Sequence, residues 1–476
     1  MVRWVPAVLG CLLLQACTSF TPKPLDPAAT IAHVDELRRA PDAVERIQGD
    51  TQSPGFTLAL AAQWMREHGP ALKEAVAAYE TALARAQIAT PLPNPGVEAG
   101  LQWGFGSDVQ RVNQVTPLGS IGFSIPLGPR LSRQDELNQA QAEVARVEAL
   151  ASYRESYLEL RERYTALVVA RSREQLQEAI SAAARRTVGV ARQLVDAGSA
   201  TAVDLALFEL EHARNRSAQL RAQQVTSAAE AGLSELIGVH AGLFAHLEES
   251  PLPDLPPSPP DLETLRDLLV AHHPILGRLR AKYEAAERSL RLEIARQYPD
   301  FNFGPFYDGE TGERKHALGL TLGLELPLFD RNQQAIAEAT ERREEVRVQY
   351  EAAANRALAE LEGAFRSVEL TSRRRELLQE QIMPRAAASI RMARDSLSAG
   401  SGDALRLLDA ERSHREIQVE LLEAELEERE AWSVLERALG YPLMTFPSEP
   451  PDSAAREPEG LEPQSGVGSA QEEDSK

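Results

Sequence analysis

The spacing of hydrophobic residues changes along this chain in an order that occurs twice, and the clearer copy covers residues 298–440. Alternating apolar and polar residues flank a polar turn at 308–313. Alternation of period two on both sides of a turn predicts a β-hairpin. After Pro327 the chain becomes a long run rich in Ala, Glu, Arg and Leu, which is broken near 398–402, and a second such run ends at Gly440. The predicted unit is a hairpin, a long helix, a glycine turn and a return helix.

The first half of the chain carries the same landmarks roughly 201 to 204 positions earlier. The matched pairs are Pro126 with Pro327, Gly198 with Gly400, Gly238 with Gly440, and Pro70 with Pro274. Landmarks repeated at nearly constant spacing indicate an internal duplication. Because the repeat is far longer than the unit of a solenoid, we expect two similar halves related by a pseudo-twofold axis.

The predicted strands separate an apolar face from a face of small or polar residues. Residues 97–105 and 120–127 place Val, Ile, Leu, Trp and Phe on one face, and every second residue of 318–326 is Leu. Each strand has about the 9 to 11 residues that a tilted strand needs to cross a membrane. Surface hairpins packed on a soluble core are the alternative.

Four strands in one chain leave two unpaired edges, and in lipid each unpaired backbone group costs several kcal/mol. Single-chain barrels begin at about eight strands, so a membrane barrel requires at least two copies of this chain, and three would give about twelve strands. If the strands cross a membrane, the protein is an obligate oligomer.

Long antiparallel helical hairpins should follow each β-hairpin. The long helices are expected at 132–195 and 332–397, the return helices at 201–237 and 403–439, and shorter helices at 31–40 and 56–87. At about 1.5 Å per residue each long helix is on the order of 100 Å long. Pro384 should kink or split the second one, whereas the first repeat has Ala182 at that place.

The chain is thus expected to be mainly α with a small β part. Its predicted organisation is a signal peptide (1–16), an extended and helical segment (17–55), repeat 1 (56–248), a Pro-rich linker (249–261), repeat 2 (262–446) and a disordered acidic tail (447–476). An apolar stretch that ends at Leu14-Gln15-Ala16-Cys17 is typical of a bacterial lipoprotein signal, with Cys17 acylated. A plain secretory signal is the alternative. One acyl group anchors weakly, so stable attachment needs a second contribution.

Composition excludes several functions. The formal net charge is −20, and no Lys/Arg face is concentrated for nucleic acid. No phosphate-binding loop or nucleophile elbow is found. His272 and His273 have no carboxylate or thiol at a spacing suited to a metal. We therefore expect no enzyme activity, cofactor or metal site.

Several short motifs, in their order along the chain, resemble one family. They are the lipoprotein box at Cys17, Ser124-Ile125-Pro126-Leu127, Leu324-Glu325-Leu326-Pro327-Leu328-Phe329, Ile382-Met383-Pro384 and Leu407-Leu408-Asp409-Ala410-Glu411-Arg412. Together with the duplication they resemble the TolC-like outer-membrane factors of bacterial efflux and type I secretion systems. The resemblance implies a homotrimer with one transmembrane β-barrel and a periplasmic α-barrel made of the long helical hairpins.

The resemblance also implies where the channel is controlled. The turns at Ala197, Gly198 and Ser199 and at Ala399, Gly400 and Ser401 would be periplasmic tips where an adaptor docks. Gly permits the tight reversal that such a tip needs. Asp204, Arg406 and Asp409 would form charge pairs that hold the aperture shut; solvated surface charges are the alternative.

The predicted function is a passive exit duct for small molecules or metal ions, embedded in the bacterial outer membrane, lipid-anchored and extending into the periplasm. Its partners would be a periplasmic adaptor protein and an inner-membrane pump, with no nucleic acid. A periplasmic coiled-coil scaffold or adaptor lipoprotein is the alternative. Two long hairpins and four alternating strands favour the duct, because an adaptor normally has a single helical hairpin.

Overall fold

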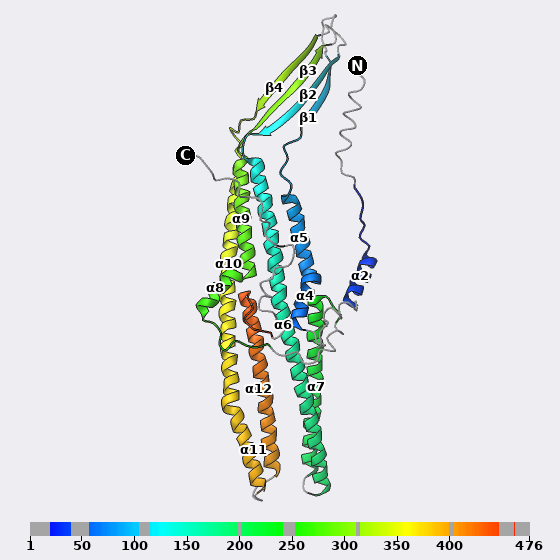
Figure 1. Cartoon of the computed structure of the whole chain (residues 1–476), viewed down its shortest axis with the longest axis vertical. Helices are drawn as coiled ribbons and strands as arrows, with labels where there is room; N and C mark the ends of the chain where they lie inside the picture. Colours follow the sequence, from blue (N-terminus) through cyan, green and yellow to red (C-terminus); the bar gives the residue numbers. More distant parts are fainter. Residues whose placement is uncertain are drawn as a thin grey trace.

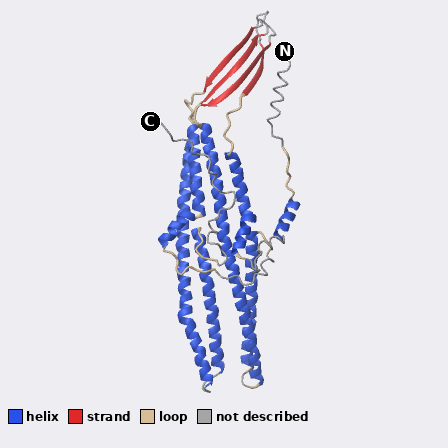
Figure 2. Cartoon of the chain, in the orientation of Figure 1, coloured by secondary structure: helices blue, strands red, loops and turns tan. Residues whose placement is uncertain are grey.

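The protein is described here by a computed structural model. It describes residues 20–39, 57–103, 115–198, 201–240, 253–310, 315–398, 404–446 and 461. Cys17, the tip residues Ser199 and 399–401, and the tail apart from Leu461 lie outside these ranges. The molecule is elongated, with one β-sheet at one end and long helices running away from it (Figures 1 and 2).

The sheet is antiparallel and its strands follow one another in chain order. β1 (Gly96–Trp103) pairs with β2 (Val115–Pro126), β2 with β3 (Asp300–Glu310), and β3 with β4 (Lys315–Leu324). The β2–β3 pairing therefore joins the hairpins of the two repeats. Within the described residues β1 and β4 each have one neighbour, so the single chain leaves two open sheet edges.

The helical part contains two long hairpins, one from each repeat. The first pairs α6 (Arg130–Asp196) with α7 (Ala202–Ile237). In the second, α10 (Gln333–Leu377) passes through a π-helical turn (Leu378–Ile382) into α11 (Met383–Ser398), and α12 (Ala404–Leu439) returns. The predicted disturbance at Pro384 is this π turn, which accommodates the proline while the chain stays helical.

Among the described residues, four shorter helices complete the upper and middle parts of the body. They are α4 (Leu58–His68), α5 (Pro70–Ala86), α8 (Leu262–His272) and α9 (Pro274–Ala295). A further helix, α2 (Pro27–Arg39), is exposed along its whole length and lies to one side of the body (Figure 1). α5 and α9 lie beside α6 in the half of the body nearer the sheet, whereas α7 and α12 lie beside α6 in the half farther from the sheet (Figure 1). No helix in the described part of the chain has the length and apolar character of a membrane span.

Glycine joints connect these upper and lower helices. Gly238, after α7, has φ +72° and lies against Pro70, the first residue of α5. Gly440, after α12, has φ +75° and lies against Pro274, the first residue of α9. A positive φ suits glycine, and proline suits the first turn of a helix. The duplication seen in the sequence therefore places the same joint twice in the structure.

The main hydrophobic core lies at the level of these joints. It collects side chains of α4, α6, α8, α10 and α12, and Trp432 is buried in it. Trp64 of α4 donates its ring N–H to the carbonyl of Ile237 at 3.1 Å, which fixes α4 to the end of α7. The core thus holds the two repeats together midway along the body.

A buried ion pair crosses this core from repeat 1 to repeat 2. Arg161 of α6 donates to both carboxylate oxygens of Glu436 of α12, at 2.8 and 3.1 Å, and to the carbonyl of Met444 at 2.7 Å. Its guanidinium also lies 4.6 Å from the centre of the Phe446 ring. Both charged side chains are almost fully buried, so each depends on the other for charge compensation.

Candidate channel wall and aperture

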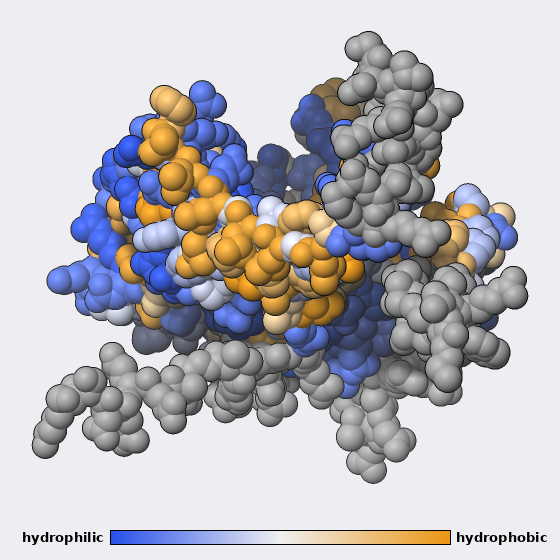
Figure 3. Space-filling model, turned by 90° about the horizontal axis from the view of Figure 1, so that it is seen from above, coloured by the Kyte–Doolittle hydropathy of each residue, from blue (hydrophilic) through white to orange (hydrophobic). Residues whose placement is uncertain are grey.

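One face of the sheet is an exposed apolar surface. Val97 pairs with Ile121, Phe123 with Phe303, and Phe303 with Leu322, so these side chains share a face. Leu318 is 81% and Leu322 63% exposed. Viewed from above, hydrophobic residues form a band over the sheet (Figure 3). A leucine-rich surface of this extent on an open sheet suits contact with lipid.

Aromatic residues lie at both ends of this apolar face. Phe301 stacks on Phe303 at a centroid distance of 6.0 Å toward the helical end. Toward the other end the Tyr307 hydroxyl is hydrogen-bonded to Nδ1 of His316 at 2.6 Å. Aromatic girdles at the two interfaces are typical of membrane β-barrels.

The opposite face carries small and polar residues. Glu98 pairs with Ser120, whose hydroxyl donates to the Glu98 carboxylate at 3.3 Å, and Asn302 pairs with Gly323. Leu118, which pairs with Gly100 and Asp308, and Phe306 are large apolar residues on this face, and the Phe306 ring covers Gly319, where a Cβ atom would lie 2.3 Å from it. A polar face opposite a lipid-facing one is the arrangement expected for the inner wall of a pore.

The far end of the first helical hairpin turns at the predicted glycine. Gly198 has φ +70° and donates its N–H to the carbonyl of Val195 at 3.0 Å, and Ala197 donates to Gln193 at 3.0 Å. Among the described residues, no atom outside its chain neighbours lies within 4 Å of where a Cβ of Gly198 would be.

Near this end the two hairpins are joined by charged residues. Nε of Arg412 on α12 lies 3.7 Å from a carboxylate oxygen of Glu211 on α7, and 3.0 Å from one of Glu416. The hydrogen bond with Glu416, the Glu211 charge and, more weakly, Asp409 raise the pKa of Arg412. A groove of about 580 Å³ between α6, α7 and α12 contains these residues together with Phe208.

Of the charged residues expected at the aperture, Arg406 and Asp409 have described side chains, and these two are not paired with each other. Arg406 is exposed and forms no ion pair with any residue that the structure describes. Asp409 is exposed and lines the groove beside Arg412. Asp204 lies in the first turn of α7, and its side chain is outside the described set. The contact between Arg412 and Glu211 was missed because it joins helices of different repeats.

The comparisons with known proteins agree with this architecture. A family profile described as "Outer membrane efflux protein" matches residues 62–239 and 265–441, which is one match in each repeat. The chain belongs to this family. Outer membrane efflux proteins are transport channels rather than enzymes, so the predicted efflux-channel function is confirmed, and the scaffold or adaptor alternative is set aside.

Individual relatives are distant in sequence. The cobalt-zinc-cadmium resistance protein CzcC of Cupriavidus metallidurans is 22% identical over 349 residues, covering 73% of this chain and 81% of CzcC. The outer-membrane channel OprN is 20% identical with a TM-score of 0.66, covering 90% of this chain and 99% of OprN. A structure of CusC, described in terms of transmembrane channel formation, is 16% identical with a TM-score of 0.65, covering 89% of this chain and all of CusC. The predicted duplicated fold is therefore confirmed.

Proposed function

We propose that three copies of this chain form one outer-membrane channel that releases divalent metal cations, supplied through a periplasmic adaptor by an inner-membrane pump. The observation that carries the trimer is the open sheet. β1 and β4 are its edges, and its exposed apolar face suits lipid. Because unpaired edges are costly in lipid, β4 of one copy pairs with β1 of the next until the ring closes. Three copies give about twelve strands, a closed barrel with a polar interior.

The cargo is proposed from chemistry and from a relative. CzcC is named for resistance to cobalt, zinc and cadmium, and it matches this chain over most of both lengths. The formal net charge of −20 gives a channel that attracts cations and repels anions. The channel itself needs no binding site for its cargo, since the pump selects what enters.

The aperture is proposed to lie at the ends of the helical hairpins. The contact of Arg412 with Glu211 joins α12 to α7 there and keeps the hairpins together. Asp204, Arg406 and Asp409 add charge at the same level, where each meets a neighbouring copy. The adaptor docks on the tips at Ala197, Gly198 and Ser199 and at Ala399, Gly400 and Ser401. Acylated Cys17 adds a second attachment to the outer membrane beside the barrel.

The mass of the detergent-extracted complex tests the trimer. Protein from the outer-membrane fraction is measured by light scattering with the detergent contribution subtracted, and a mass of three chains is expected. A monomer that is released without detergent would refute the shared barrel.

Growth tests the cargo separately. A strain lacking the gene should be inhibited by lower concentrations of zinc, cobalt or cadmium salts, and the intact gene should restore its resistance. Unchanged metal resistance together with a three-chain mass would reject the metal cargo and leave the channel standing.

A further inference from the structure

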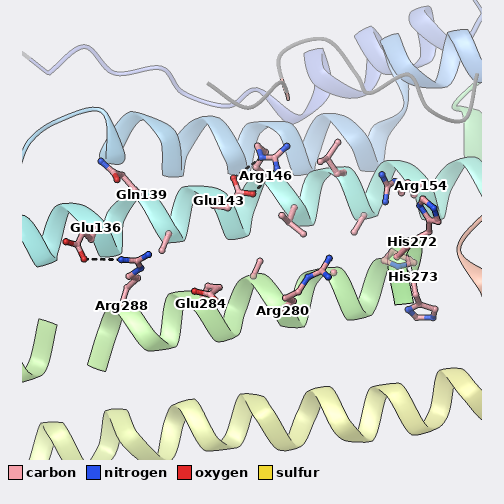
Figure 4. A pocket seen from close by; sticks show the side chains of 18 residues that line it. Glu136, Gln139, Glu143, Arg146, Arg154, His272, His273, Arg280, Glu284 and Arg288 are labelled. Carbon is pink, nitrogen blue, oxygen red and sulfur yellow. Dashed lines mark hydrogen bonds and ion pairs between the residues drawn. The ribbon is translucent and has the colours of Figure 1, made fainter. Parts of the chain in front are cut away.

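A groove of about 810 Å³ lies between α6 and α9, in the half of the helical body nearer the sheet. Figure 4 shows side chains of both helices lining it, with Arg146 and Arg154 on α6 and Arg280 and Arg288 on α9. None of these residues belongs to the sheet face or to the aperture. The groove is thus a separate surface, and its lining includes four arginines.

Two of the four arginines are neutralised within the groove and two are not. Arg288 lies 3.3 Å from Glu136, and Arg146 lies 2.8 Å from Glu143. Arg154 and Arg280 form no ion pair or hydrogen bond with any residue in the described ranges. Unpaired cations that share a groove attract an acidic ligand.

The titratable groups near Arg154 do not neutralise it. Burial, and then the charge of Arg154, lower the pKa of His272, so its ring is mostly uncharged at neutral pH and adds no charge to this end of the groove. Glu284 is an exposed carboxylate in the groove, but it follows Arg280 by one helical turn and lies toward Arg288 (Figure 4). Among the described residues that line the groove, none supplies a carboxylate at the end near Arg154.

One residue of the C-terminal region, Leu461, lies close to this groove. Leu461 is fully buried against Tyr79 of α5 and Ala149 of α6. Its carbonyl accepts a hydrogen bond at 3.2 Å from Nη1 of Arg146, a residue that also lines the groove. One point of the C-terminal region is thus fixed at the border of the groove, and the residues that follow begin there.

We propose that the groove between α6 and α9 binds an acidic peptide and that this peptide is the chain's own segment 462–476. The segment contains Glu462, Glu472, Glu473 and Asp474 against one basic residue, Lys476. Extended at about 3.3 Å per residue it reaches about 50 Å. α9, with 22 residues, spans about 33 Å. From Leu461 the acidic cluster 472–474 therefore reaches Arg280 and Arg154, and its carboxylates pair with them.

The docking is tested with a cysteine placed in the groove. Ala281, which lines it, is replaced by Cys, and the rate of maleimide labelling is measured in the full-length protein. The parent chain, which contains only Cys11 and Cys17, gives the background. A chain that ends at Leu461 should be labelled about fivefold faster than the full-length chain, since two exposed ion pairs are lost along with the covering segment.

Charge variants distinguish docking from general crowding by the tail. Glu472→Gln/Glu473→Gln/Asp474→Asn, in the full-length chain, should raise labelling of Cys at 281 as truncation does. The double variant Arg154→Gln/Arg280→Gln should also raise the labelling rate at position 281. Salt at about 0.5 M should raise it too, because exposed charges are screened at that concentration. Cys at the exposed position Ala359 on α10 should be labelled at one rate in all these variants. Equal labelling at position 281 with and without the tail would overturn the proposal.

A disulfide assigns the occupant to its own chain. Ala281→Cys combined with Ser475→Cys should, on oxidation, give a cross-linked species with the mass of one chain. A dimer-sized cross-linked band would mean that a neighbouring copy's tail fills the groove, and it would overturn the assignment to the chain's own segment.

Discussion

Replacing Arg161 by Met tests whether the buried ion pair holds the two repeats together. The substitution removes two hydrogen bonds to Glu436, one to the Met444 carbonyl and the contact with the Phe446 ring. Methionine fills much of the same volume, so the cost is mainly electrostatic. Glu436 still accepts hydrogen bonds from the backbone N–H groups of Leu443 and Met444, but it loses the guanidinium that balances its charge. Leaving one partner of a buried pair uncompensated costs about 3 to 5 kcal/mol.

The same two helices supply a matched control. Arg437 of α12 lies 2.7 Å from Glu162 of α6, but its side chain is 59% exposed. An exposed pair contributes about 0 to 1 kcal/mol, so Arg437→Met should change little. Urea unfolding of the detergent-solubilised protein, followed by the fluorescence of the buried Trp432, measures both variants. If Arg161→Met lowered the free energy of unfolding no more than Arg437→Met does, the interpretation of this pair as a link between the repeats would be refuted.

Three further predictions concern the joints, the core and the aperture. Gly440→Ala should cost about 2 kcal/mol more in the free energy of unfolding than Gly238→Ala. Both positions have positive φ, but only at 440 would the new Cβ lie 2.8 to 3.1 Å from atoms of the junction between α8 and α9, at His272, His273 and Pro274. Equal losses in urea unfolding would contradict this. Burial lowers the pKa of His273 below its ordinary 6.5. The neutral His273 ring therefore contributes its full stability above about pH 6.5, and this contribution is lost as the pH falls toward the lower pKa of the folded state. In thermal melts between about pH 7 and 5, the His273→Asn variant should lose less stability than the parent protein. Arg412→Gln should raise the conductance of the closed channel in planar bilayers. Adding Glu211→Gln should raise it little further, because the contact between Arg412 and Glu211 is already lost in the single variant. Unchanged conductance would show that this contact does not hold the channel closed.

Much of the fold follows from short-range patterns in the sequence. The expected return helices, 201–237 and 403–439, differ from α7 and α12 by one residue at the start and none at the end. Both end at a glycine of positive φ, a local feature that is visible in the sequence. Strict alternation likewise predicted the strands, although β4 ends at Leu324 and not at Leu326.

The packing between distant segments could not be derived in this way. Arg161 and Glu436 are 275 positions apart, and nothing near either residue in the sequence indicates the other. The contact between Arg412 and Glu211 and the burial of Leu461 are of the same kind. The π turn before Pro384 was predicted only as a disturbance, because sequence does not distinguish a kink, a break and an added residue within one turn.

The position of α6 also restricts how the length of this protein can change over evolution. The helix is 67 residues long and contacts α5 and α9 in its upper part and α7 and α12 in its lower part. One inserted residue adds about 1.5 Å and turns everything beyond it by about 100°. Every partner on one side of the insertion would then face the wrong side chains. Changes of length are therefore expected at the Gly198 turn. They are also expected as whole heptads gained or lost together in α6 and α7, because a heptad is nearly two full helical turns and leaves the side chains of both helices facing almost the same partners.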